Sequence, residues 1–172
     1  MPFRSATARR RAACLTIACL VGAAACRDLG FEPQDPATVA YASSLGINLS
    51  QFTRLLNGVY VRDVAVGSGT QAESTSTVGI NYRGYLASGQ AFDTTYATAT
   101  YTQPLAGFVP GFRTGLLGVR QGSRRQLIVP PGLAYGNRTY NAIPAGSVLF
   151  FDVNLVNVTT PAPTTASSRA PR

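Results

Sequence analysis

The chain has 172 residues, which suits one domain of ordinary size with additional segments at its ends. Its 15 basic residues are all arginine and outnumber the 7 acidic residues, which gives a formal net charge of +8. Six of these arginines lie in the terminal segments, and the others are dispersed along the chain apart from the adjacent Arg124 and Arg125. This distribution argues against nucleic-acid binding, and the lack of histidine excludes catalytic triads and metal sites that depend on that residue.

The first 25 residues have the layout of a secretory signal peptide. A basic start that ends at Arg11 is followed by an apolar segment over residues 12–25, and small residues precede Cys26. The apolar segment is too short to span a membrane as a helix. We therefore predict that residues 1–25 are removed and that the mature protein is exported, to the periplasm or the cell surface.

Cys26 is the one cysteine that would remain after this cleavage, because Cys14 and Cys19 lie within the apolar segment. A lone cysteine at a cleavage junction is typical of the lipid-attachment residue of a bacterial lipoprotein, which would anchor the protein to a membrane. Such signals usually have leucine where this chain has Ala23, and Ala23 with Ala25 equally suits an ordinary signal peptidase. A lipid anchor at Cys26, simple secretion and an uncleaved leader therefore remain as alternatives.

Residues 26–57 are predicted to form a tether. Leu49, Phe52, Leu55 and Leu56 follow the spacing i, i+3, i+6 and i+7, which fits a short amphipathic helix or turn. We expect the apolar end of this tether to pack against the following domain. A helix that docks a partner is the alternative interpretation.

The domain itself is predicted over residues 58–158. Residues 58–69 form a strand that ends in a glycine-rich turn, and Val78, Ile80 and Tyr82 alternate with less apolar residues as in a half-buried strand. A turn at residues 87–90 leads to a second strand. The threonine-rich residues 94–102 favour an edge strand or a flap.

One short helix and two more strands complete the domain. Pro110 and Gly111 begin the helix, in which Phe112 and Leu116 are four residues apart. Strands follow at residues 123–129 and 148–158, and one face of the last strand is strongly apolar. This order predicts an α+β fold, in which an antiparallel sheet of five to six strands wraps around one short helix. Residues 159–172 contain mainly Thr, Pro, Ala and Ser and are predicted to be a disordered tail.

Few conventional catalytic groups are present in the domain. Its carboxylates are Asp63, Glu73, Asp93 and Asp152, which gives little support to a paired-carboxylate hydrolase, and no phosphate-binding loop occurs. The cysteines offer no metal-ligand spacing. We therefore expect neither a cofactor nor a metal.

Three motifs carry a resemblance to a known family. They are NYRGYLASGQAFD at residues 81–93, QPLAGFVPGFRTGLLGVRQGSRRQLIVPPGLAYG at residues 103–136, and IPAGSVLFFDVNLVNV at residues 143–158. In this order and spacing they resemble the FK506-binding-protein class of peptidyl-prolyl isomerases. The resemblance implies rotation of Xaa-Pro bonds in unfolded or partly folded proteins, and inhibition by FK506-like macrolides.

The resemblance also implies which residues form the site. Seven catalytic positions make up an aromatic and apolar pocket with a few polar contacts: Tyr82, Phe92, Asp93, Val109, Phe112, Tyr135 and Phe151. Three further positions bind substrate: Tyr101, Phe108 and Ile143. Phe112 would form the floor, the backbone N–H of Val109 would hold a substrate carbonyl, and the hydroxyl of Tyr135 would bond to the ligand.

Such a pocket needs no acid or base. The barrier to rotation, roughly 18–20 kcal/mol, comes from amide resonance. In an apolar cleft the planar amide loses more solvation free energy than the twisted amide does. Binding in such a cleft therefore lowers the barrier to rotation. A non-catalytic peptide-binding chaperone or scaffold that uses the same groove is the alternative, and each aromatic residue taken alone also fits a plain core position.

The chain departs from the family pattern at three places. Phe112 stands where many members have Trp. Residues 94–102 contain no basic residue to pair with Asp93, which leaves the orientation of that carboxylate open. The loop at residues 137–142 is short and lacks the large apolar residue often found before the position of Ile143.

Overall fold

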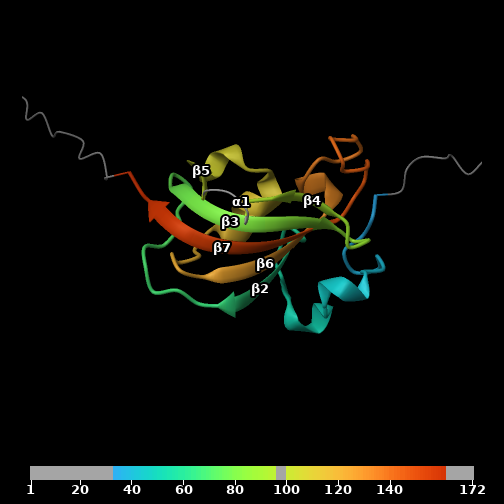
Figure 1. Ribbon diagram of the computed structural model, residues 1–172, viewed down its shortest axis with the longest axis horizontal. Coiled ribbons are helices and arrows are strands. Elements are labelled where there is room, and N and C mark those ends of the chain that lie inside the picture. The colour runs from blue at the N-terminus through green and yellow to red at the C-terminus, as the bar shows by residue number, and fades with distance from the viewer. Residues whose placement is uncertain (1–32, 96–99, 162–172) are drawn as a thin grey trace, which may run out of the picture. The chain divides into compact units, whose positions relative to one another are not determined.

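The computed structural model describes residues 33–95 and 100–161 (Figure 1). The predicted signal peptide, Cys26, part of the predicted flap and most of the predicted tail lie outside these residues. The helical elements are the 3₁₀ helices η1 (Ser43–Leu45), η2 (Leu49–Gln51), η3 (Leu105–Gly107) and η4 (Pro131–Leu133) and the helix α1 (Pro110–Leu116). The strands are β1 (Thr53–Arg54), β2 (Tyr60–Ala65), β3 (Thr77–Leu86), β4 (Ala91–Thr94), β5 (Tyr101–Pro104), β6 (Arg124–Val129) and β7 (Leu149–Thr159).

All seven strands belong to one antiparallel sheet, in the order β1-β2-β6-β7-β3-β4, with β5 pairing to β3 beside β4. The long strands β3 and β7 run side by side through its middle (Figure 1), and their pairing extends from Thr77 opposite Thr159 to Leu86 opposite Leu149. The antiparallel sheet and the single short helix confirm the predicted fold class. The sheet has one strand more than the five to six expected, because β1 lies in the predicted tether and pairs with β2.

The helix α1 packs on one face of the sheet, where it covers the main apolar core. Pro110 occupies its first turn, where a missing N–H costs no helical hydrogen bond. Phe112 and Leu116 are buried against this core, together with Leu127 and Val129 of β6. Full burial of each such side chain stabilises the fold by about 1.5–3 kcal/mol. The helix thereby holds the ring of Phe112 at the concave face of the sheet.

The opposite face of the sheet carries a second apolar cluster, which the sequence analysis missed. Phe150, at an alternate position of β7, is only 3% exposed and packs with Ile128, Val148 and Phe52. Residues 39–49 cover this cluster with five partly buried side chains: Val39, Tyr41, Leu45, Ile47 and Leu49. Residues 33–57 are therefore packed on the sheet over much of their length.

The helical pattern at residues 49–56 does not produce an amphipathic helix. Only one 3₁₀ turn forms, at Leu49–Gln51, after Asn48, whose side-chain oxygen accepts a hydrogen bond from the Ser50 N–H. The chain then enters β1 and turns at Gly58, whose φ of 90° suits glycine, and Leu56 is left fully exposed. At the other end of the domain, β7 continues to Thr159, one residue into the predicted tail.

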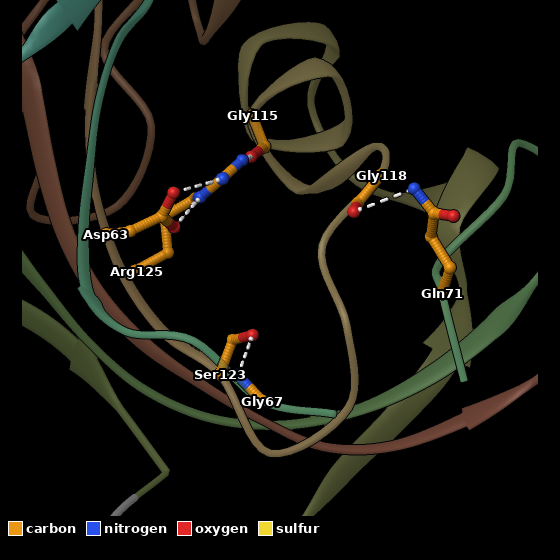
Figure 2. Close-up of polar contacts among 7 residues, drawn as sticks. All are labelled: Asp63, Gly67, Gln71, Gly115, Gly118, Ser123 and Arg125. Carbon is orange, nitrogen blue, oxygen red and sulfur yellow. Dashed lines mark hydrogen bonds and ion pairs between the residues drawn. The ribbon is translucent and has the colours of Figure 1, made fainter. Parts of the chain in front are cut away.

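Polar contacts fix the C-terminal half of α1 (Figure 2). Arg125 on β6 forms a bidentate pair with Asp63 on β2, with N···O distances of 2.6 and 2.7 Å, and its Nη1 donates to the carbonyl oxygen of Gly115 at 3.0 Å. A cation at this end of a helix satisfies a carbonyl that has no helical partner. The neighbouring Arg124 pairs with Asp152, so each member of the predicted arginine pair has a carboxylate partner.

The segment after α1 is held against residues 67–72 (Figure 2). The Gly67 N–H donates to the Ser123 hydroxyl at 2.9 Å, and the Gln71 side-chain amide donates to the Gly118 carbonyl at 3.0 Å. The Ala72 N–H donates to the Val119 carbonyl at 2.8 Å, and the Gly118 N–H donates to the Ala72 carbonyl at 2.9 Å. These bonds limit the movement of the helix relative to the sheet and so stabilise the position of its buried face.

Across residues 33–95 and 100–161, no helix has both the length and the hydropathy required to cross a membrane.

Candidate active site

A cavity of about 430 Å³ opens between the concave face of the sheet, α1 and the loop after η4. All ten predicted site residues line it: Tyr82 on β3, Phe92 and Asp93 on β4, Tyr101 on β5, Phe108 and Val109 before the body of α1, Phe112 on α1, Tyr135 and Ile143 on the loop, and Phe151 on β7. The wall also includes five residues that were not predicted: Gln103, Gly107, Tyr140, Asn141 and Ala142. Segments far apart in the sequence thus converge on one hollow.

The floor of the cavity is a set of aromatic rings around Phe112, which is 2% exposed. Its ring stacks on Phe108 with centroids 4.7 Å apart and meets Phe151 edge to face at 5.0 Å. Tyr82 lies edge to face with the same ring at 6.1 Å. Offset and edge-to-face contacts of this kind are the favoured aromatic geometries, so the rings hold one another in place.

Phe92 forms a side wall because β3 has a glycine behind it. The Phe92 ring stands perpendicular to that of Phe151, with centroids 5.6 Å apart. A Cβ atom at Gly84 would lie 2.6 Å from Cζ of Phe92, which is closer than real Cβ contacts allow. The glycine in the NYRGYL motif therefore shapes the pocket, although it has no side chain to line it.

The orientation of Asp93, left open by the sequence, is determined by two donors. The hydroxyl of Tyr82 donates to Oδ2, and the backbone N–H of Thr94 donates to Oδ1 at 2.8 Å. Burial raises the pKa of the Tyr82 hydroxyl above its ordinary value, and the hydrogen bond to Asp93 and the charge of that carboxylate raise it further. Tyr82 is therefore a protonated donor at neutral pH, and it holds Asp93 without help from a basic flap residue.

Tyr140 supplies aromatic surface from the loop at residues 137–142, which lacks the large apolar residue often found before the position of Ile143. Its ring stacks on that of Tyr135 with centroids 4.5 Å apart and planes within 8°. Reciprocal backbone bonds between Tyr140 and Ile143 form a tight turn in which Asn141 has a φ of 48°. Burial raises the pKa of the Tyr135 hydroxyl, with smaller effects from Tyr140 and Asp93. A tyrosine three residues before the predicted rim residue was the signal available in the sequence.

The remaining side of the cavity comes from β5 and the turn that follows it. The Tyr101 hydroxyl donates to Oε1 of Gln103 at 3.0 Å, and the Tyr101 ring lies edge to face with Phe108 at 6.1 Å. Asp93 is the one ionisable carboxylate among the lining residues, and no arginine lines the cavity. Over the described residues, no group of three His, Cys, Asp or Glu side chains is placed to hold a metal ion.

We expect the free energy of unfolding to fall as the pH rises above about 10, the ordinary pKa of tyrosine. Tyr41, Tyr82 and Tyr135 have raised pKa values in the folded chain, mainly because of burial, so the unfolded chain loses these protons first. Below pH 10 both the folded and the unfolded chain keep these protons, so the contribution of the tyrosines to the free energy of unfolding is constant. Above it the unfolded state binds fewer protons, so stability declines with pH.

Urea unfolding at pH 9, 10 and 11 measures this decline. The chain has neither lysine nor histidine, and its cysteines all lie in the first 26 residues, so tyrosines dominate the alkaline range. Tyr82→Phe should make the decline shallower than in the unaltered chain. Equal slopes in the two proteins would contradict the assignment of the raised pKa to Tyr82.

Known proteins are similar to this chain in sequence. A sequence model of the family described as FKBP-type peptidyl-prolyl cis-trans isomerase matches residues 68–156. The FKBP-type peptidyl-prolyl cis-trans isomerase FkpA of Escherichia coli (strain K12) is 35% identical over 127 residues, which are 72% of this chain and 44% of that protein. FK506-binding protein 3 of Candida albicans is 38% identical over 106 residues, which are 60% of this chain and 25% of that protein. The chain therefore spans less than half the length of these curated relatives.

Solved structures agree with the fold described above. The crystal structure of FkpA from Escherichia coli superimposes with a TM-score of 0.63 at 33% sequence identity, covering 70% of this chain and 56% of that chain. The crystal structure of AtFKBP13 has a TM-score of 0.57 at 28% identity, and the match covers 63% of this chain and 98% of that one. The antiparallel sheet with its short helix is common to all three proteins.

Proposed function

The chain belongs to the FKBP-type peptidyl-prolyl cis-trans isomerase family, and from this we propose that its pocket accelerates rotation about Xaa-Pro bonds in unfolded or partly folded proteins. The observation that carries the proposal is the convergence of ten family-like positions on one aromatic cavity of about 430 Å³. A prolyl ring with its neighbouring peptide groups fits a hollow of this size.

The proposed mechanism is desolvation of the planar amide. The planar Xaa-Pro bond has charge separation from resonance, and this separation is lost as the bond twists toward the transition state. In an aromatic cavity the planar form loses more solvation than the twisted form, so the pocket binds the transition state better than the ground state. The rings of Phe112, Phe151 and Phe92 supply this surface, and no proton transfer is required.

Polar groups at the wall would orient the substrate. We assign the backbone N–H of Val109 and the hydroxyl of Tyr135 as donors to substrate carbonyls, because both residues line the cavity beside its aromatic floor. The Tyr82 hydroxyl, which donates to Asp93, keeps this carboxylate in the cavity wall as a polar contact for the substrate. Tyr101, Phe108 and Ile143 complete the substrate-binding surface.

The direct test is an isomerisation assay on a proline-containing peptide with the purified chain. The uncatalysed reaction takes tens to hundreds of seconds, so catalysis is measured as a faster approach to equilibrium. FK506 should compete with the peptide for the cavity. A rate equal to that of buffer, from protein shown to be folded, would refute the catalytic proposal. If such protein still kept an unfolded, proline-free client soluble, the chaperone alternative would replace it.

We further propose that the protein acts outside the cytoplasm, attached to a membrane through a lipid on Cys26. The signal-like layout of residues 1–25 and the lone cysteine after it support this proposal. Mass spectrometry of the mature N-terminus tests it, with Cys26→Ser as the control that cannot be acylated. A mature chain that begins at Cys26 without added acyl mass would leave simple secretion as the explanation.

A further inference from the structure

Residues 135–146 include five of the 15 residues that line the cavity. Tyr135 stands immediately before residues 136–146, and Tyr140, Asn141, Ala142 and Ile143 lie within them. The base of this loop is closed by a backbone hydrogen bond of 2.8 Å from the Gly146 N–H to the Gly136 carbonyl. The positions of Tyr140 and Ile143 over the cavity thus depend on how this base is held.

Apart from the turn between Tyr140 and Ile143 and the stacking of Tyr140 on Tyr135, the loop has few buried side chains. Residues 137–142 are all exposed, and Ile143 is the first buried side chain after them. Gly136 and Gly146 have φ values of 60° and 67°, in the left-handed region where glycine is favoured. A loop with few buried contacts and two glycines at its base opens at low free energy unless another segment holds it.

Gln34, from outside the loop, makes two hydrogen bonds near the base of the loop. Its backbone N–H donates to the Gly146 carbonyl at 2.9 Å, and its side-chain Oε1 accepts from the Val148 N–H at 2.8 Å. Gly146 is therefore bonded on two sides, to Gly136 within the loop and to Gln34 outside it. Val148 is fully buried with Gln34 in place, and its N–H loses this acceptor if the Gln34 side chain is withdrawn.

Gln34 is in turn anchored to the sheet by the residues that follow it. We call residues 34–52 the strap. The Tyr41 hydroxyl donates to the Pro36 carbonyl at 2.9 Å, the Ala42 N–H donates to the Ala87 carbonyl at 2.8 Å, and Phe52 packs in the second apolar cluster. The strap lies outside residues 68–156, which match the family.

We propose that the strap is a positioning element of the pocket: through Gln34 it holds the base of the loop at residues 136–146 so that Tyr140 and Ile143 face the bound peptide. The inference rests on the proposed function for its substrate. Gln34 does not touch the cavity, so it acts only through the loop. When the binding-competent orientation is only partly populated, the apparent affinity falls in proportion to that fraction.

Gln34→Ala removes the acceptor of the Val148 N–H and should weaken binding while sparing turnover. We expect KM and the peptide Kd to rise about three- to fivefold, as for the loss of one ordinary hydrogen bond. The kcat should stay within about twofold, because bound substrate meets the same aromatic floor. Gln34→Glu keeps an oxygen acceptor and should remain close to the unaltered chain. Gln51→Ala, an exposed glutamine on the same strap, is the matched control.

Amide hydrogen exchange at Gly146 and Val148 provides the second measurement, which needs no activity. In Gln34→Ala both amides should exchange about tenfold faster, since exchange reports local opening. Faster exchange with unchanged KM and Kd would overturn the proposal by showing a purely structural contact. Unchanged exchange would overturn it as well.

The failure of the proposed function is distinguishable from the failure of this inference. If the unaltered chain binds a proline peptide without isomerising it, only the catalytic proposal is refuted. The peptide Kd of each variant, measured by titration, then tests the role of the strap. A weaker Kd in Gln34→Ala, with Gln34→Glu and Gln51→Ala unchanged, supports the strap. Equal Kd values in all four proteins overturn it.

Discussion

Replacing Phe112 by alanine is expected to abolish isomerisation and to lower the free energy of unfolding by about 3–5 kcal/mol. Phe112 is buried at the junction of the core and the cavity, and its ring contacts those of Phe108, Phe151 and Tyr82. Removing the ring leaves a void in the core and frees three neighbouring rings to move. The pocket then loses both its floor and the shape that excludes water from the bound amide.

The matched control is Phe150→Ala. Phe150 is also nearly fully buried, but it lies in the second cluster on the opposite face of the sheet. Both substitutions should lower stability in urea unfolding by similar amounts, whereas only the one at Phe112 should remove activity from the folded fraction. Phe112→Leu retains most of the apolar volume and serves if the alanine variant does not fold. Full activity in folded Phe112→Leu would contradict the role of the ring.

Gly111→Ala should destabilise the protein by about 3 kcal/mol, the upper range for overpacking a core. A Cβ atom at this position would lie 2.3 Å from Cγ1 of the buried Val129 and 3.1 Å from Cβ of Leu133. The Val129 side chain has little room to withdraw, since it is fully buried in the main core. The start of α1 must therefore move away from β6, and Phe112 moves with it.

Gly132→Ala tests whether this effect comes from close packing. Gly132 lies near the same contact, in η4, but a Cβ atom there would meet nothing within 4 Å. We expect it to be neutral or to stabilise the chain by up to about 1 kcal/mol, because alanine restricts the unfolded state. Thermal unfolding of both variants measures the difference. Similar melting temperatures would contradict the close approach of α1 to β6.

The pocket residues were predicted from the resemblance of three motifs, in their order and spacing, to FK506-binding proteins. Strand alternation placed Tyr82 and Phe151 on the inward face, and Pro110 marked the start of the helix that carries Phe112. All ten predicted positions line the cavity, although their roles in catalysis stay predictions. The fold class followed from the same strands and from the one short helix expected between them.

Only the end of the strap, with Leu49 and Phe52, was expected to pack on the domain, and the packing of residues 39–47 was not predicted. Val39, Tyr41, Leu45 and Ile47 occupy alternate positions along the chain, a short pattern that does not show what covers them, and they are partly buried because Phe150 and Ile128 lie opposite them on the sheet. Nothing local in the chain indicates such a partner. The alternation in β7 indicated that one face of this strand is in the core. The other face is buried by a segment about a hundred residues earlier in the chain, and this contact depends on the tertiary fold.

Three details of the site depended on three-dimensional contacts in a similar way. The position of Asp93 is determined by the Tyr82 hydroxyl, which is eleven residues away along the chain. Gly84 matters through the space it leaves for the Phe92 ring. Tyr140 joins the wall because it stacks on Tyr135. Each of these contacts forms between residues that are distant in the sequence, and their residue types alone do not indicate it.

The pairing of β3 with β7 has a consequence for synthesis of the chain on the ribosome. The middle of the sheet joins residues 77–86 to residues 149–159, so an incomplete nascent polypeptide lacks its central strand. Phe151, a wall of the cavity, emerges last among the residues that line it. Such distant pairings form slowly, because a long loop must close before they are made. The cavity is therefore complete only after translation of the domain has ended.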